Sequence, residues 1–150
     1  VTFQIETNKG SGFESIEKIA SGGELSRIML AIKVSLSSDI SDVNTRKTLI
    51  FDEVDTGVGG AVADAIGKRL LLLGTNNQVL AVTHHPQVAA RSNNHFKVNK
   101  STNNSFTSTS IINLEVKERI EEVARMLSGE KITDAARNAA ESLFINSKSL

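Results

Sequence analysis

Residues 18–36 read KIASGGELSRIMLAIKVSL, and in this stretch a Ser-Gly-Gly turn leads directly into an apolar helix. If Ser21 lies just before the helix, the backbone N–H groups around Gly22 and Gly23 lack partners within the helix and point outward. The helix dipole adds partial positive charge there, which stabilises an anion such as a phosphate. The same residues are also expected in a simple N-cap followed by a flexible turn. This stretch alone therefore does not distinguish an anion-binding site from a helix cap.

The spacing of apolar residues from Glu24 onward predicts an amphipathic helix, because one stripe of large side chains recurs every three or four positions. Upstream, VTFQIET at residues 1–7 alternates apolar and polar residues, which predicts a half-buried strand. The predicted helical stripe consists of Leu25, Ile28, Met29, Ile32 and Leu36.

Two apolar runs further along the chain predict a strand–helix–strand unit. The first extends from Leu49 to Phe51 within TLIFDEVD, and the second from Val79 to Val82 within NNQVLAVTHHP. Such runs are typical of buried strands in a sheet that is covered on both faces. A helical stripe between them favours parallel pairing of the two strands. That stripe is Val62, Ile66, Leu70 and Leu73.

The last third of the chain predicts an antiparallel hairpin followed by two helices. Residues 95–112 alternate around a turn at Asn103 and Asn104. The second of the two helices starts with Thr133 as its N-cap. The first of the two helices carries the stripe Val116, Ile120, Val123 and Leu127 and stops at Gly129.

The sequence contains no repeat and no clear linker, so residues 1–150 are interpreted as one α/β domain.

Acidic side chains follow the first apolar run directly. Asp52 and Glu53 would lie at the carboxyl edge of the sheet, where α/β proteins bind their ligands. Asp52 suits a hydrated Mg²⁺ ion, and Glu53 is then placed to polarise an attacking water. The plain alternative is a solvated turn after a core strand.

Two histidines follow the second apolar run and should reach the same sheet edge. A histidine there can donate a hydrogen bond to a phosphoryl oxygen or orient a base. The alternatives are a metal pair or ordinary surface histidines. His84 and His85 are adjacent on an extended segment, so their side chains diverge, which argues against zinc.

Composition restricts the partners that the chain can have. The charges of its 17 basic and 17 acidic residues cancel, so the net charge does not indicate nucleic-acid binding. There is no cysteine and no window of the roughly 20 apolar residues that a membrane-spanning helix needs. The segment GGAVADAIGKR is similar to the phosphate-binding loop G-x-x-x-x-G-K-[ST] but does not match it. Val62 stands at the position of the first glycine, and Arg69 stands at the position of the Ser or Thr. Because the chain begins with Val1 inside a strand-like run, we interpret it as a piece of a longer protein.

The order of these segments carries more information than each alone. SGGE, then LIFDE, then TH resembles the signature motif, Walker B motif and switch histidine in the C-terminal half of an ABC-type (P-loop NTPase) ATPase head. Within this class, IASGGELSRIMLAIK, TLIFDEVDTGVGG, VLAVTHHPQVAA and IEEVARMLSGEKITDAAR resemble the bacterial RecN family of SMC-like double-strand-break repair proteins. The resemblance covers about residues 18–144. It implies a mostly parallel sheet with flanking helices and a terminal hairpin.

The resemblance also implies roles for individual residues in a site that binds ATP and Mg²⁺. In this family two heads sandwich the nucleotide, and the phosphate loop belongs to an N-terminal lobe beyond a long coiled coil, both absent from residues 1–150. Asp55 and Thr56 would lie near the dimer interface. The implied catalytic residues are Glu53, as the base, and His84, as the γ-phosphate sensor. Asp52 would hold Mg²⁺ through water. The implied cofactor-binding residues are Ser21, Gly22, Gly23, Glu24 and Asp55.

From this resemblance we expect an ATPase that hydrolyses ATP to ADP and phosphate as a full-length dimer, with the fragment alone inactive. The expected partners are its own N-terminal lobe, a second head and DNA, and no membrane partner is expected. The expected process is recombinational repair, and the expected location is the bacterial cytoplasm, at the nucleoid. Gly59 stands where many relatives have an aspartate, and His85 receives no role. The alternatives are a head lobe of another SMC protein or transporter, or a non-catalytic dimerisation or DNA-interaction module. A missing lobe would leave apolar surface exposed and favour self-association.

Overall fold

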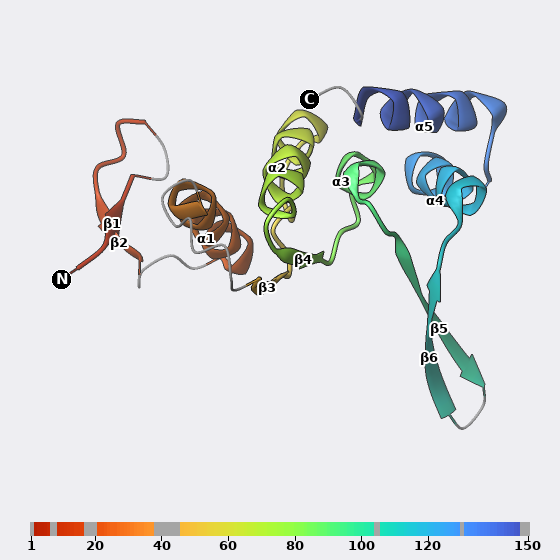
Figure 1. Cartoon of the computed structure of the whole chain (residues 1–150), viewed down its shortest axis with the longest axis horizontal. Helices are drawn as coiled ribbons and strands as arrows, with labels where there is room; N and C mark the ends of the chain where they lie inside the picture. The colour runs from red at the N-terminus through yellow and green to blue at the C-terminus, as the bar shows by residue number, and fades with distance from the viewer. Residues whose placement is uncertain are drawn as a thin grey trace.

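The computed structural model describes residues 2–6, 9–16, 21–37, 46–103, 106–129 and 131–147. The elements follow one another along a long molecule, from the β1–β2 pair at one end to α4 and α5 at the other (Figure 1). No described helix is both long and apolar enough to cross a membrane. The element bounds are β1 Gln4–Ile5, β2 Glu14–Ser15, α1 Gly22–Ser37, β3 Thr48–Phe51, α2 Gly60–Leu73, β4 Gln78–Ala81, α3 Pro86–Arg91, β5 Phe96–Asn103, β6 Phe106–Asn113, α4 Val116–Ser128 and α5 Asp134–Ser147.

The predicted strand–helix–strand unit is confirmed. β3 and β4 pair in parallel, with Leu49 opposite Val79 and Phe51 opposite Ala81, and α2 forms the crossover between them. In the described part of the chain, the other strands form two separate antiparallel pairs, β1–β2 and β5–β6. The carboxyl ends of β3 and β4 therefore lie side by side, as a site at the edge of a parallel sheet requires.

The described residues cover only one face of the β3–β4 sheet. Phe51 is buried, whereas Ile50, Leu80 and Val82 are 71%, 43% and 63% exposed. The prediction that these strands are buried on both faces is therefore wrong for this chain, because no described element packs over the second face. The buried members of the first core cluster are Leu30, Phe51, Val54, Ala63, Ile66, Leu70, Leu73 and Val88.

The stripe predicted to be the buried side of α1 is instead largely exposed. Leu25, Met29 and Leu36 are 42%, 43% and 47% exposed. The core is contacted from another side of the helix, where Leu30 is buried and Val34 packs against the cluster. Helix α1 therefore has two apolar sides, and this chain covers the smaller one.

The C-terminal part follows the sequence prediction closely. β5 and β6 form the antiparallel hairpin, which projects away from the helices (Figure 1), and Asn104 of its predicted turn lies outside the described residues. Thr133 caps α5, since its hydroxyl accepts a hydrogen bond from the Ala136 N–H at 3.2 Å. Gly129 ends α4 with a φ of 79°, a conformation that favours glycine.

The short helix α3, which the sequence analysis did not predict, connects the two hydrophobic clusters. Val88 belongs to the cluster around β3, β4 and α2, and its neighbour Ala89 belongs to a second cluster formed with α4 and α5. Arg91, which is buried, forms an ion pair with the half-buried Asp64 on α2, with its Nη2 2.8 Å from Oδ1 of Asp64. Although burial alone would raise the pKa of Asp64, hydrogen bonds from Arg91 and Lys68 outweigh it and hold that pKa below its usual value.

Candidate functional site

Three segments far apart in the sequence meet at the carboxyl end of the β3–β4 sheet. They are the first turn of α1, the loop that follows β3 and the loop that follows β4. The hydroxyl of Ser26 donates to the Asp52 carbonyl at 2.8 Å, and Nη1 of Arg27 donates to the Thr56 carbonyl at 3.0 Å. These two hydrogen bonds attach α1 to the loop that carries the predicted acidic residues.

The two glycines of the Ser-Gly-Gly turn lie directly against Glu53. A Cβ on Gly22 would be 3.1 Å from Oε2 of Glu53, and one on Gly23 would be 3.0 Å from the Glu53 carbonyl oxygen. A side chain at position 23 would press on the backbone of the loop, whereas one at position 22 would meet only the end of the flexible Glu53 side chain, so the close approach of the backbones explains the glycine at position 23. The structure thus brings together the first two predicted parts of the site.

Ser21 acts as the N-cap of α1. Its hydroxyl accepts a hydrogen bond from the Glu24 N–H at 3.4 Å, and its carbonyl accepts one from Leu25 at 3.1 Å. Among the described residues, none accepts a hydrogen bond from the N–H of Gly22 or Gly23. The capping interpretation and the anion-binding interpretation are therefore compatible, since the cap leaves two backbone donors available at the positive end of the helix.

The carboxylates of Asp52 and Glu53 both belong to exposed residues. No described donor forms a hydrogen bond or an ion pair with either carboxylate. Glu53 has a φ of 57°, in the left-handed region that non-glycine residues rarely adopt. Its carbonyl accepts a hydrogen bond from the Thr56 N–H at 3.1 Å, which closes a tight turn after β3. The turn presents both acids to solvent rather than to the core.

Asp55 lies beneath this turn and is almost completely buried, at 1% exposure. Its Oδ2 accepts a hydrogen bond from the Thr83 hydroxyl, and its Oδ1 lies 3.9 Å from Nδ1 of His84. Within this chain its contacts are with the segment that carries His84, and the role of Asp55 in cofactor binding stays a prediction.

His84 stands on the loop after β4 with its side chain 66% exposed. Its ring centroid is 4.5 Å from that of His85, which begins α3 as the N-cap residue. The described residues contain no group of three or more His, Cys, Asp or Glu side chains that could hold a metal ion. His84 thus presents a solvent-facing imidazole at the same sheet end as Asp52 and Glu53.

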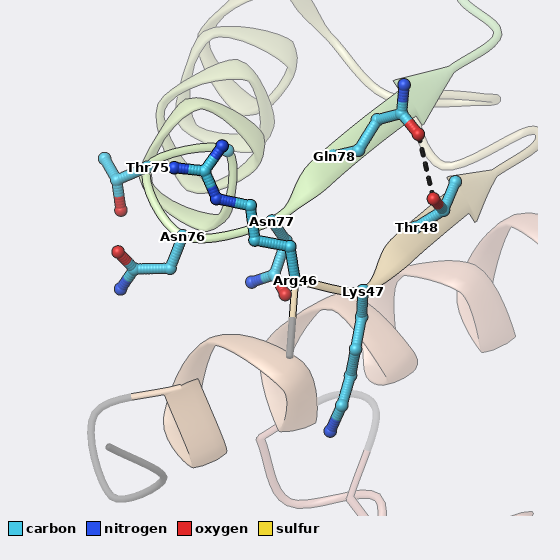
Figure 2. A pocket seen from close by; sticks show the side chains of 8 residues that line it. Arg46, Lys47, Thr48, Thr75, Asn76, Asn77 and Gln78 are labelled. Atoms are coloured by element: carbon cyan, nitrogen blue, oxygen red, sulfur yellow. Dashed lines mark hydrogen bonds between the residues drawn. The ribbon is translucent and has the colours of Figure 1, made fainter. Parts of the chain in front are cut away.

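A separate cleft lies at the opposite end of the sheet, where β3 and β4 begin. Its volume is about 380 Å³, and the hydroxyl of Thr48 donates to Oε1 of Gln78 across it at 2.8 Å (Figure 2). The residues that line it include none of the predicted site residues; they are Arg46, Lys47, Thr48, Gly74, Thr75, Asn76, Asn77 and Gln78.

Three residues that organise the site were missed by the sequence analysis. Ser26 and Arg27 are polar residues within the apolar stretch of α1, and Thr83 is the residue before the histidine pair. Polar residues inside an apolar helix one turn from a predicted site are a signal that could have identified the first two. Thr83 carried no such signal, because its role depends on the burial of Asp55.

No family model matches the chain. The fold corresponds to a solved structure from work on ATP-driven dimerization and DNA-stimulated activation of SMC ATPases. The TM-score is 0.50 at 15% sequence identity, and the match covers 81% of this chain and 70% of that one. The chain therefore has an α/β fold similar to that of this structure from work on SMC ATPases.

Sequence comparison finds curated proteins that are similar to nearly the whole chain. The chain is similar to the DNA repair protein RecN of Rickettsia felis (46% identical over 144 residues), Xylella fastidiosa strain 9a5c (48% over 142) and Bacillus subtilis strain 168 (44% over 144). These matches cover 95% or 96% of this chain but only 24% to 26% of each relative. The chain is thus similar to RecN proteins over nearly its whole length, and it spans about a quarter of the length of the curated relatives it matches.

Proposed function

We propose that this chain is the C-terminal lobe of an ATPase head in a RecN-type DNA repair protein, and that it supplies half of an ATP site. The observation that supports this most is the meeting of Gly22 and Gly23 with Glu53, at the sheet end that also carries His84. The sequence lacks a phosphate-binding loop, so the triphosphate would be held mainly by an N-terminal lobe.

In this proposal the Ser-Gly-Gly turn binds the γ-phosphate of an ATP held by a second head. The free N–H groups of Gly22 and Gly23 would donate to phosphoryl oxygens at the positive end of α1. The Ser21 hydroxyl would donate a further hydrogen bond while it still accepts one from the Glu24 N–H. The backbone N–H of Glu24, in the first turn of α1, donates to the Ser21 hydroxyl that caps the helix, and the Glu24 carboxylate would lie at the rim of the site.

Asp52 would hold Mg²⁺ through water. Its exposed carboxylate has no partner among the described residues, which suits an ion that keeps several waters and uses few protein ligands. The bound ion would neutralise charge that develops on the β- and γ-phosphoryl oxygens. The backbone of Asp52 is held by Ser26, so its side chain would be presented from a fixed position.

Glu53 and His84 would act on the attacking water and the γ-phosphate. The unpaired carboxylate of Glu53 can accept the proton of a water molecule positioned in line with the phosphate. The exposed imidazole of His84 can donate a hydrogen bond to a phosphoryl oxygen, where charge accumulates during transfer. Positioning and electrostatic stabilisation from two chains are most of what phosphoryl transfer needs.

The wider role follows from the family. We propose that ATP-dependent pairing of two such heads opens and closes a DNA-engaging assembly in recombinational double-strand-break repair, in the bacterial cytoplasm. The similarity to RecN proteins and the SMC-type fold support this role.

The decisive experiment measures ATP turnover by this chain alone and by the chain mixed with its N-terminal lobe. Activity is expected only in the mixture, and Glu53→Gln should reduce kcat by roughly 10²- to 10⁴-fold, because it removes the general base. Glu141→Gln is the matched control, since Glu141 is an exposed acid on α5, far along the chain from the site.

Turnover by the chain alone would contradict the proposed division of the site between two lobes. A mixture whose lobes are folded and associated but inactive would instead support a non-catalytic interaction module.

A further inference from the structure

Asp55 is a buried acid whose two oxygens have different surroundings. Oδ2 accepts the Thr83 hydroxyl, whereas Oδ1 is buried and has no hydrogen-bond donor among the described residues. An unsatisfied buried carboxylate oxygen is costly unless a charged or polar group lies beside it. The ring of His84 is such a group, with Nδ1 3.9 Å from that oxygen.

Thr83 links Asp55 to the residues on both sides of His84 in the sequence, through the hydrogen bonds of its hydroxyl. Its hydroxyl donates to Asp55 and accepts a hydrogen bond from the backbone N–H of His85 at 3.0 Å. The residues on either side of His84 are thereby held by one buried carboxylate. The His85 ring, tilted by 43° at a centroid distance of 4.5 Å, limits the His84 side chain further.

We propose that Asp55 is the positioning residue of the site: it fixes the ring of His84 with Nδ1–H toward Oδ1 and Nε2 toward the nucleotide. A carboxylate is an acceptor only, so the nitrogen that faces it carries the proton, and in the neutral ring Nε2 keeps its lone pair. A hydrogen bond from Nε2 to a phosphoryl oxygen then requires the doubly protonated ring, in which both nitrogens are donors.

The orientation of the ring is independent of the proposed function, whereas its consequence for hydrolysis rests on that function. The test therefore needs two readouts, one of which uses no ATP.

The first readout is the tautomer of His84, measured on this chain without nucleotide from the ¹⁵N chemical shifts of the two ring nitrogens. At a pH where the ring is neutral, the wild-type chain should show protonated Nδ1. In Asp55→Asn the Thr83 hydroxyl can still donate to the side-chain oxygen, which turns the amide N–H toward His84. Nδ1 must then accept, and the proton should move to Nε2. His85 and His95 serve as internal references in the same spectrum.

Two further variants separate positioning from general loss of structure. Thr83→Ser keeps the hydroxyl and should keep the wild-type tautomer. Asp64→Asn removes another carboxylate, one that pairs with Arg91 and Lys68 instead of a histidine, and should leave the His84 signals unchanged.

The second readout is turnover of the assembled head. Asp55→Asn should lower kcat by roughly 10²-fold, in the range of a lost proton-transfer group, and leave the KM for ATP nearly unchanged. A wild-type ring protonated on Nε2, or the same tautomer in wild type and Asp55→Asn, would overturn the proposal without any use of the variant's activity. A shifted tautomer with unchanged kcat would overturn its catalytic part, and a shifted tautomer in a head that never hydrolyses ATP would refute the proposed function alone.

Discussion

At the scale of the residue, Glu53 combines an exposed carboxylate with a φ of 57°. The neighbouring contacts hold it there, because the Thr56 N–H donates to its carbonyl and Gly22 and Gly23 lie directly against it. Strained backbone persists only where surrounding structure fixes it, and such positions concentrate at functional sites. The strain therefore supports the role proposed for the side chain.

Glu53→Gly should separate stability from activity. Glycine adopts positive φ freely, which removes a strain of about 1–2 kcal/mol, while its greater freedom in the unfolded chain takes back roughly 0.5–1 kcal/mol. The free energy of unfolding should thus rise by up to ~1 kcal/mol in urea denaturation, although ATP turnover of the assembled head is lost. Glu53→Gln retains the strain and should leave stability nearly unchanged. A destabilised Glu53→Gly variant would show that the side chain contributes more to folding than the backbone strain costs.

His95 offers a pH-dependent prediction away from the site. Its burial lowers its pKa below the usual 6.5, and the charges of Arg119 and Lys97 lower it further, against the opposing effect of Glu122. The unfolded chain therefore binds a proton at His95 more readily than the folded chain does. The corresponding stability is present above about pH 6.5 and is lost as the pH falls from there through the folded-state pKa.

Denaturation by urea at pH 7.5 and 5.5 measures this loss. The wild-type chain should lose more stability across this interval than His95→Gln, whose side chain does not titrate. The acids Asp64 and Glu122, whose pKa values lie below the usual 3.8 and 4.5, respond only at lower pH and do not interfere. Equal pH dependence of wild type and His95→Gln would contradict the prediction.

At the scale of the element, α2 and α3 approach each other most closely at Gly67. A Cβ at this position would lie 2.9 Å from Cδ of Arg91 and 3.4 Å from the backbone of Gln87 and Val88. Arg91 is buried and paired with Asp64, so it cannot move aside easily. Close helix packing, and not backbone flexibility, explains a glycine in the middle of α2.

Gly67→Ala should therefore destabilise the chain, although alanine is the better helix former by about 1 kcal/mol. Overpacking of this kind costs typically 1–3 kcal/mol, so a net loss of roughly 1 kcal/mol is expected in thermal or urea denaturation. Gly60→Ala is the matched control on the same helix, because the added methyl would meet only the flexible end of Gln87. A Gly67→Ala variant as stable as Gly60→Ala would mean that α3 shifts without cost.

The sequence predicted most elements but not which of their faces are covered. Continuous apolar runs identified β3 and β4, although one face of these strands is exposed, and periodicity identified α2, whose Ile66, Leu70 and Leu73 are buried. It failed for α1, where Leu25 and Met29 form the more prominent stripe but Leu30 contacts the core. A pattern shows that a face is apolar, whereas the partner that covers it depends on tertiary structure. Pro86, at the first position of α3, was the signal for the missed helix.

The candidate site was predictable to a similar degree. Asp52, Glu53 and His84 follow apolar runs, so sequence order alone placed them at one sheet edge. The position of Asp55 could not be inferred in this way, because the turn after β3 directs its side chain inward and burial is set by the loop geometry. The positive φ of Glu53 could not be predicted either, because nothing in the sequence distinguishes this turn from an ordinary one.

At the scale of the whole molecule, the chain exposes apolar surface on two elements that a globular domain would cover. One is the second face of the β3–β4 sheet, with Ile50, Leu80 and Val82, and the other is the stripe of α1. Contiguous apolar surface of this kind marks an interaction site or favours association. It agrees with a chain that spans about a quarter of the length of its curated relatives, and with the proposal that its site is completed by other lobes.

The chain alone should therefore self-associate, and Ile50→Thr should weaken this association. Threonine keeps the β-branched shape of the strand residue but removes apolar area, at a cost of roughly 1–2 kcal/mol per buried side chain, or about tenfold in Kd. Val116→Thr is the control, because Val116 is 70% exposed like Ile50 at 71%, but it lies at the start of α4, away from the sheet. Sedimentation velocity over a concentration series distinguishes the outcomes. A wild-type chain that stays monomeric at every concentration, or equal association of the two variants, would show that the uncovered sheet face does not cause association.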